Sequence, residues 1–327
     1  MKGGASMGKT RFVKDIKEGE QVRDLFLVGN KIQLVSNSGK PYLNLTLRDR
    51  TGQFEGRVWD RAEEIGKRFD RDDIVEVSGT AIQYQGRTQL KVHDVQKVAG
   101  GTPDLGEFLP VTKRGIDPLW RQLRELVAGV SDAPLRELLE SVFPDPPDTD
   151  LSRRFRQAPG GKSMHHDYIG GLLEHTVSVA VICRFLAAHY EGVDGDLLVA
   201  GSLLHDIGKV EELSYEGTFD YTDPGRLLGH LYLGAERVSR TCETIAGFPE
   251  EKKMLLTHMI LSHHGELEYG SPKRPKTLEA VLLHFVENMD AKSNAFTEAM
   301  EDLREGARWT EYNRMFERYL FSGKPGK

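Results

Sequence analysis

Cysteines and long apolar runs are both scarce in this sequence of 327 residues. Cys183 and Cys242 are the only cysteines, which excludes the disulfide framework that holds small secreted domains together. No run approaches the roughly 18 uninterrupted apolar residues of a membrane-spanning helix, and residues 1–12 have no apolar signal-peptide core. We therefore expect a cytoplasmic protein with no membrane partner.

An excess of basic residues is also missing. Lys and Arg number 44 against 50 Asp and Glu, a formal net charge of −6, which argues against a protein coated in basic surface for duplex DNA. Hydrophobic residues make up 39% and charged residues 29%, as in globular proteins. Because the chain is about twice as long as one hydrophobic core favours, two domains are expected.

The first part of the chain alternates apolar and polar residues. Leu43, Leu45 and Leu47 share one face of a run that ends at a turn over residues 49–52, and residues 53–59 continue the pattern. About five such runs lie between residues 25 and 92, with a short helical stretch near residues 61–69 between the third and the fourth. This order predicts an all-β OB-fold barrel over residues 12–99.

The second part has the period of helices. A Gly/Pro hinge at residues 99–103 and a proline-rich stretch at residues 143–148 bound a linker with connecting helices over residues 100–150. From residue 151 to 322 apolar residues recur every 3.6 positions, which predicts an all-α domain. We expect one helix from about Leu172 to Leu186 and others over residues 194–205, 226–244, 250–262, 277–296 and 298–319.

Residues 3–10 match the phosphate-loop pattern G-x-x-x-x-G-K-[ST] letter for letter. Such a loop binds phosphate only where a buried strand leads into it and a helix follows. Here two residues precede the pattern, so we reject it as a nucleotide site.

Histidines are concentrated in the helical part, where ten of the eleven follow residue 164. His175 lies inside an apolar helix, and the doublet His205-Asp206 ends another. An ionisable side chain on an apolar face is costly to bury without a partner. The same feature recurs at His230, at the pair His263-His264, and at Asp290.

A divalent cation explains why such residues would converge. Imidazole and carboxylate ligands without a nearby cysteine suit Mn²⁺, Fe²⁺, Co²⁺, Ni²⁺ or Zn²⁺. We predict that a first ion is bound by His175, His205, Asp206 and Asp290. A second ion would be bound by His230, His263 and His264, with Asp206 as the bridge. We interpret His93, His189, His258 and His284 as ordinary core or surface residues.

Aromatic and basic residues lie on the predicted outer face of the barrel. Residues 11–100 contain 16 Lys and Arg against 14 Asp and Glu, a local charge of about +2. OB-folds bind single strands through stacking platforms and cations that follow the phosphates. We predict such contacts at Tyr42, Arg48, Arg57, Trp59, Tyr84 and Arg87.

The histidine pattern resembles the H…HD…D motif of the HD-domain metal-dependent phosphohydrolases, and the later histidines resemble the extra ligands of its dinuclear members. The order of the two halves, the run HHDYIGGLLEH at residues 165–175 and SHHGE at residues 262–266 more closely resemble the YhaM-type 3′-5′ exoribonucleases, over nearly the whole chain. This resemblance implies an enzyme that removes nucleotides from the 3′ ends of single-stranded RNA, with Mn²⁺ favoured.

Four residues are assigned to chemistry. Asp206 holds the ions that activate a water molecule. Lys209 lies four residues after His205, where a continuing helix would direct its ammonium group at the phosphate. His166 and Tyr168 lie in a Gly-flanked loop before His175 and are candidates for contacting the terminal nucleotide or protonating the leaving oxygen.

Other functions fit parts of the sequence. An HD-domain enzyme for small nucleotides or cyclic dinucleotides would use the barrel for assembly, although residues 268–272 read EYGSP where the cyclic-dinucleotide enzymes have Gly-Tyr-Pro. A non-catalytic single-strand-binding protein with a structural metal is a further alternative. Single-stranded DNA as substrate and a homo-oligomeric state also stay open.

Overall fold

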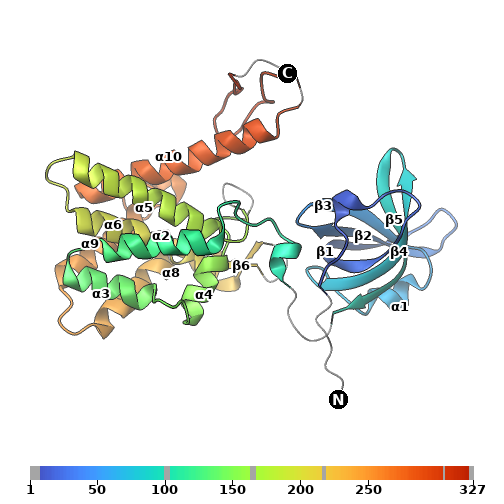
Figure 1. Ribbon diagram of the computed structural model, residues 1–327, viewed down its shortest axis with the longest axis horizontal. Coiled ribbons are helices and arrows are strands. Elements are labelled where there is room, and N and C mark those ends of the chain that lie inside the picture. The colour runs from blue at the N-terminus through green and yellow to red at the C-terminus, as the bar shows by residue number, and fades with distance from the viewer. Residues whose placement is uncertain (1–7, 99–103, 163–166, 216–218, 305, 324–327) are drawn as a thin grey trace. The chain divides into compact units, whose positions relative to one another are not determined.

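The computed structural model describes residues 8–98, 104–162, 167–215, 219–304 and 306–323. The chain divides into two compact units. Met1–Val111 with Ser214–Asp220 forms the first, and Thr112–Leu213 with Tyr221–Lys327 forms the second. A barrel of strands is the body of the first unit, and helices form the second (Figure 1).

The barrel is closed and has the strand order β1-β2-β3-β5-β4. Its neighbours pair antiparallel except β3 and β5, which run parallel and close the barrel. A short helix, α1, lies between the third and fourth strands, as predicted for an OB-fold. The elements are η1 (Val13–Asp15), β1 (Gln21–Val35), β2 (Pro41–Asp49), β3 (Gly52–Val58), α1 (Ala62–Gly66), β4 (Ile74–Tyr84), β5 (Arg87–Lys97) and η2 (Leu105–Glu107).

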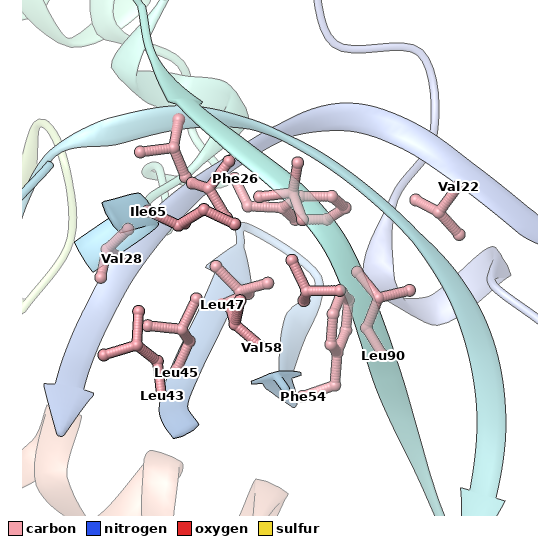
Figure 2. Packing of buried hydrophobic residues seen from close by; sticks show 14 of the residues in the cluster. Val22, Phe26, Val28, Leu43, Leu45, Leu47, Phe54, Val58, Ile65 and Leu90 are labelled. Carbon is pink, nitrogen blue, oxygen red and sulfur yellow. The ribbon is translucent and has the colours of Figure 1, made fainter. Parts of the chain in front are cut away.

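Alternating burial along the strands builds the barrel core. Leu43, Leu45 and Leu47 of β2 are buried, and Phe54 and Val58 of β3 face the same interior. Figure 2 shows these side chains gathered around Phe26 together with Ile65 of α1. The period of two therefore predicted the buried face of both strands correctly.

Two strand pairings of the closed barrel contain an irregularity in register. The pairing of β1 with β2 shifts register between Val28 and Asn30, and that of β4 with β5 shifts between Ser78 and Gly79. A Cβ atom on Gly79 would lie 2.7 Å from the carbonyl oxygen of Lys91, so only glycine allows this close approach. Such bulges bend a strand and increase its twist.

Lys9, from the rejected phosphate-loop pattern, is buried in the barrel. Its ammonium group donates to the carbonyl oxygen of Leu25 at 2.6 Å and lies 3.2 Å from Oδ2 of Asp49. The group also lies 3.8 Å from the ring centroid of Phe26. Lys9 is therefore engaged by the barrel's own residues.

The second unit is a bundle of helices. Antiparallel packing of α5 with α6 and α10 forms its centre (Figure 1). Its helices are α2 (Ile116–Ala128), α3 (Ala133–Val142), α4 (Asp150–Gln157), α5 (Gly171–His189), α6 (Gly195–Leu204), α7 (Lys209–Glu212), α8 (Asp223–Thr244), α9 (Glu250–Ser262), η3 (Leu267–Tyr269) and α10 (Leu278–Glu301). The short strands β6 (Leu213–Ser214) and β7 (Asp220–Tyr221) pair with each other at the two points where the division of the chain changes from one unit to the other.

The helical unit begins earlier than the predicted boundary at residue 151. Helices α2 and α3 each bury an apolar face, which includes Leu119, Leu123, Leu135 and Leu139. These faces pack against α5, α6 and α8, so residues 112–150 belong to the bundle. The Pro-rich stretch that suggested a domain boundary is a turn between α3 and α4.

One predicted helix is wrong. Residues 298–319 are not a helix: α10 ends at Glu301, and in the described residues beyond it the backbone pairs Trp309 with Phe321 and Asn313 with Arg318. The aromatic residues of this segment pair across the turn instead: the rings of Trp309 and Phe321 have centroids 4.8 Å apart, and those of Tyr312 and Tyr319 meet edge to face at 5.7 Å. Cross-strand pairing produced a spacing that imitates a helix.

Helix α5 is long and apolar enough, by length and composition alone, to cross a membrane. This differs from the expectation that the sequence has no such stretch. The helix packs against α6, α10 and α2, and half of its most apolar window is buried inside the unit. It carries His175, so it is a core helix that leads to the candidate site.

Candidate metal centre and nucleic-acid surface

His175, His205 and Asp206 form the first of two groups of metal-binding side chains. His175 comes from α5, and the other two follow the end of α6. The Nε2 atoms of the two histidines are 3.2 Å apart, and Oδ2 of Asp206 lies 3.6 Å from that of His175 and 3.4 Å from that of His205. All three side chains are buried.

His230, His263 and His264 form the second group. His230 lies within α8, and the other two follow α9. The Nε2 atoms of His230 and His264 are 3.3 Å apart. Oδ1 of Asp206 lies 3.6 Å from Nε2 of His230 and 3.5 Å from Nε2 of His263, so the two oxygens of one carboxylate face the two groups.

Each of the five imidazoles has an acceptor at Nδ1. A neutral imidazole carries one proton, and in such a ring this acceptor favours the proton on Nδ1 and a lone pair on Nε2. Four of these Nε2 atoms, those of His175, His205, His230 and His263, lie 3.4–3.6 Å from an oxygen of Asp206. The acceptors are Asp290 Oδ2 for His175, Ser202 O for His205, Glu212 Oε1 for His230, Ile260 O for His263 and Tyr269 O for His264, at 2.7–3.0 Å.

Two buried atoms in this centre have no hydrogen-bond partner, namely Oδ1 of Asp206 and Nε2 of His263. Burial lowers the pKa of His175 and His264 to about 4 and that of His263 well below its usual value, so these rings are neutral. Burial alone would raise the pKa of Asp206, but Lys209 and His205 outweigh it and keep this carboxyl ionised. A buried carboxylate ion with histidine nitrogens around it favours the binding of a cation.

The distances also suit metal ions. Nitrogens bound to one ion at about 2.1 Å, with angles between octahedral and tetrahedral, lie about 3.0–3.4 Å apart. The Nε2 pairs of the two groups, at 3.2 and 3.3 Å, fall in that range. The donor set therefore fits divalent cations on both sides of Asp206.

The turn after α6 brings these residues together. His205 follows the last residue of α6, and Asp206 continues into a tight turn that ends in α7. A Cβ atom on Gly208 would lie 2.1 Å from the carbonyl oxygen of His230. The glycine of the H-D-I-G-K sequence thus lets this turn press against α8 and places His230 beside Asp206.

Lys209 and Asp290 lie next to the first group. The ammonium group of Lys209 is 2.7 Å from Oδ2 of Asp206, on the side of His175 and His205. The carboxylate of Asp290 accepts from Nδ1 of His175 and from the hydroxyl of Ser178. In this structure Asp290 thus supports His175 from behind, and its predicted role as a direct ligand stays a prediction.

Of the two loop residues assigned to chemistry, Tyr168 is described. Its hydroxyl donates to Oε2 of Glu174 at 3.0 Å, and the same oxygen accepts from the hydroxyl of Thr112. Burial and the Glu174 carboxylate raise the pKa of Tyr168 far above its usual value, so the phenol stays protonated. His166 lies outside the described residues.

The sequence analysis missed two acidic residues beside this centre. Glu212 contacts His230 although 18 residues separate them. Glu287, one turn before Asp290 on α10, has its pKa raised by burial and by Asp206. Neither could be found from spacing, because each meets its neighbours through tertiary packing of α7, α8 and α10.

The residues predicted to bind nucleic acid divide into two places on the barrel. Arg57, Tyr84 and Arg87 line a groove of about 910 Å³, together with Lys14 and Gln53. The guanidinium group of Arg57 lies 5.2 Å from the ring centroid of Tyr84. This groove combines cations with an aromatic ring, as single-strand surfaces do.

The other three predicted residues lie elsewhere. Tyr42 and Trp59 stack on each other with ring centroids 4.5 Å apart. Trp59 is 41% exposed and lines a shallower hollow with Lys40 and Arg61. Arg48 is half-buried, and its Nε has no partner. Arg57 is half-buried in the same way, but it lines the groove with Arg87, whereas Arg48 is not among the residues that line it.

Comparisons with known proteins agree with this architecture. Residues 27–98 match the family of OB-fold nucleic acid binding domains, and residues 172–292 match the HD domain family. Among solved structures, the second OB-fold domain of replication protein A from Methanococcus maripaludis is similar over 27% of this chain and 94% of that chain, with 18% identity and a TM-score of 0.23.

Two curated proteins are similar over nearly the whole chain. Both are named 3′-5′ exoribonuclease YhaM. The one from Geobacillus sp. (strain WCH70) is 33% identical over 93% of this chain and 94% of its own length. The one from Bacillus subtilis (strain 168) is 32% identical over 88% of this chain and 90% of its own length.

Fold and site together define an OB-fold domain joined to an HD domain with a histidine-aspartate metal centre. At this identity and coverage, the chain belongs to the YhaM family of 3′-5′ exoribonucleases.

Proposed function

We propose that this protein is a metal-dependent hydrolase that shortens single-stranded RNA from its 3′ end. Family membership supports the reaction class. The observation that carries the proposal is Asp206, whose two oxygens face two groups of imidazole lone pairs. Such an arrangement would hold two ions, and a non-catalytic strand-binding protein has no need of it.

We assign separate roles at the scissile phosphate to the residues of this centre. We assign the first ion to His175, His205 and Asp206, and the second to His230, His263, His264 and Asp206. Divalent ions bound there would supply an activated water and Lewis-acid stabilisation of the phosphoryl oxygens. Lys209 is placed to neutralise charge that develops on the phosphate. We propose Mn²⁺ as the ion because the resemblance to the YhaM-type exoribonucleases implies it; the imidazole and carboxylate ligands also suit Fe²⁺, Co²⁺, Ni²⁺ and Zn²⁺.

The barrel would capture the strand. Arg57 and Arg87 are placed to contact phosphates, and Tyr84 offers a ring on which a base can stack. Because duplex RNA offers no unstacked bases, we expect it to be bound and degraded poorly. Cytoplasmic location, self-association and activity on single-stranded DNA stay predictions of the sequence.

A degradation assay tests the proposal. The purified protein is incubated with Mn²⁺ and 5′-labelled single-stranded RNA, and a ladder that shortens from the 3′ end is expected. Asp206→Ala serves as the inactive control. If RNA stays intact while small nucleotides or cyclic dinucleotides are hydrolysed, the substrate class is wrong. If neither is cleaved, the protein is not a hydrolase.

A further inference from the structure

We propose that Glu212 is a positioning residue that holds His230 at the second metal position. It is not among the residues assigned to the metals or to the phosphate. The inference rests on the proposed function, because it requires a second ion beside His230, His263 and His264.

A single oxygen of Glu212 holds both the backbone and the ring of His230. Oε1 accepts from the backbone N–H at 3.0 Å and from Nδ1 at 2.9 Å. The two contacts set the position of the residue, the rotation of its ring and the place of its proton. As a result Nε2 is left with a lone pair, directed at Oδ1 of Asp206 and Nε2 of His264.

A break in α8 makes the backbone contact necessary. Gly229 has φ 74° and ψ 158°, so the helix is interrupted there and restarts at His230. The first N–H groups of a helical segment have no acceptor within it. The carboxylate of Glu212 supplies that acceptor, and a negative charge at the start of a helix is favourable.

Glu212 is itself held firmly. Its carbonyl oxygen accepts from the backbone N–H of Thr222 at 2.9 Å. A Cβ atom on Gly225 would lie 2.2 Å from the same oxygen, so the first turn of α8 packs directly on the backbone of Glu212. Its side chain is 11% exposed. The carboxylate therefore has little freedom to turn away from His230.

Glu212 also differs from the acceptors behind the other two histidines of the second group. His263 and His264 donate to backbone carbonyls, which are neutral. A carboxylate behind a metal-binding imidazole increases the basicity of the ring, and loss of such a partner typically costs about 10- to 100-fold in metal affinity. Removing Glu212 should therefore weaken the second ion and spare the first, which His230 does not bind.

Metal binding by the full-length protein tests this inference without relying on activity. Mn²⁺ is titrated into wild type, Glu212→Ala and Glu211→Ala, with bound metal counted by elemental analysis and followed by electron paramagnetic resonance. Glu211 is the matched control, since its side chain pairs with Arg237 and touches none of the proposed ligands. Two neighbouring Mn²⁺ ions are magnetically coupled, whereas a lone ion gives an isolated six-line spectrum.

We expect two ions per chain in wild type and in Glu211→Ala. In Glu212→Ala the second ion should bind about 10- to 100-fold more weakly, and the coupled signal should give way to the isolated one. Glu212→Gln keeps an oxygen acceptor but loses the charge, so its second ion should weaken by about tenfold. This variant decides the question if Glu212→Ala does not fold.

Two results would count against different claims. Unchanged affinities for both ions in Glu212→Ala and Glu212→Gln would overturn the role of Glu212. A wild-type protein that saturates with one ion would instead overturn the second metal of the proposed function.

Discussion

The metal centre of the helical unit and the groove of the barrel are built in opposite ways. Around Asp206, side chains from four helices and turns converge: His175, His205 and His263 are buried, and each has Nε2 within 4 Å of the carboxylate. In the barrel, Tyr84 is 47% exposed, and the cations of the groove lie along separate strands. One site is a single buried unit, and the other is a surface of separate contacts.

This difference predicts how each region responds to change. A ligand removed from a buried centre leaves the remaining charges and lone pairs unbalanced, so its loss affects the whole centre. A contact removed from an exposed groove costs little beyond its own share. Activity should therefore fail abruptly with changes near Asp206 and decline in steps with changes in the barrel.

The largest effect is expected for His205→Ala and Asp206→Ala. Lewis-acid stabilisation of several kcal/mol corresponds to roughly a thousandfold or more in rate. Both variants should lose turnover of RNA to that extent and bind less Mn²⁺, while circular dichroism shows a helical content close to that of wild type. Mn²⁺-dependent activity retained in both would contradict the metal centre.

A smaller loss is expected for Lys209→Met. Removing one group that stabilises transition-state charge typically costs about 10²- to 10³-fold in kcat. Because Lys209 lies beside the metal position and not in the barrel, RNA affinity should change little. The comparison of kcat with the dissociation constant, measured without added metal, separates these effects. A variant that loses affinity and keeps kcat would place Lys209 in strand binding.

A graded loss is expected for Tyr84→Ala in the groove and Trp59→Ala outside it. A lost base stack typically costs about 1–3 kcal/mol of binding. Tyr84→Ala should lose this much affinity for single-stranded RNA, measured in an Asp206→Ala background to prevent cleavage. Trp59→Ala should lose less, because one face of its ring already stacks on Tyr42. Hydrolysis of bis-p-nitrophenyl phosphate should be unchanged in both variants. An equal loss of activity on RNA and on this small ester would contradict the proposal that the barrel binds the strand while the helical unit cleaves it.

The smallest effect is on the salt dependence of binding. Each phosphate contact to a single strand contributes a log–log slope of about −0.7. Arg57 and Arg87 line the groove and Arg48 does not, so a combined contribution of about −1.4 is expected from Arg57 and Arg87. Arg57→Gln and Arg87→Gln should each reduce the slope by about 0.7, and Arg48→Gln should not. If Arg48→Gln also makes the slope less negative by about 0.7, the strand crosses the face of β2 that carries Arg48.

The local pattern of the sequence determined which faces are buried and which residue types gather. Alternation at Leu43, Leu45 and Leu47 predicted the core face of β2, because side chains alternate across a strand. Apolar helices interrupted by His175 and by His205-Asp206 predicted ligands beside a core, because an unpaired polar group is costly to bury. The pattern at residues 298–319 misled, since aromatic pairs across a turn repeat much as a helix face does.

Only the tertiary structure decided which distant groups meet. The parallel pairing of β3 with β5, the packing of Gly208 against His230 and the contact of Glu212 with His230 join residues that no local period relates. The contact of Asp290 with Nδ1 of His175 is another such meeting, between α10 and α5, and the role of Asp290 as a direct ligand stays a prediction. Periodicity reports the environment of one element, whereas these contacts depend on how two elements approach each other, which the packing of the whole unit determines.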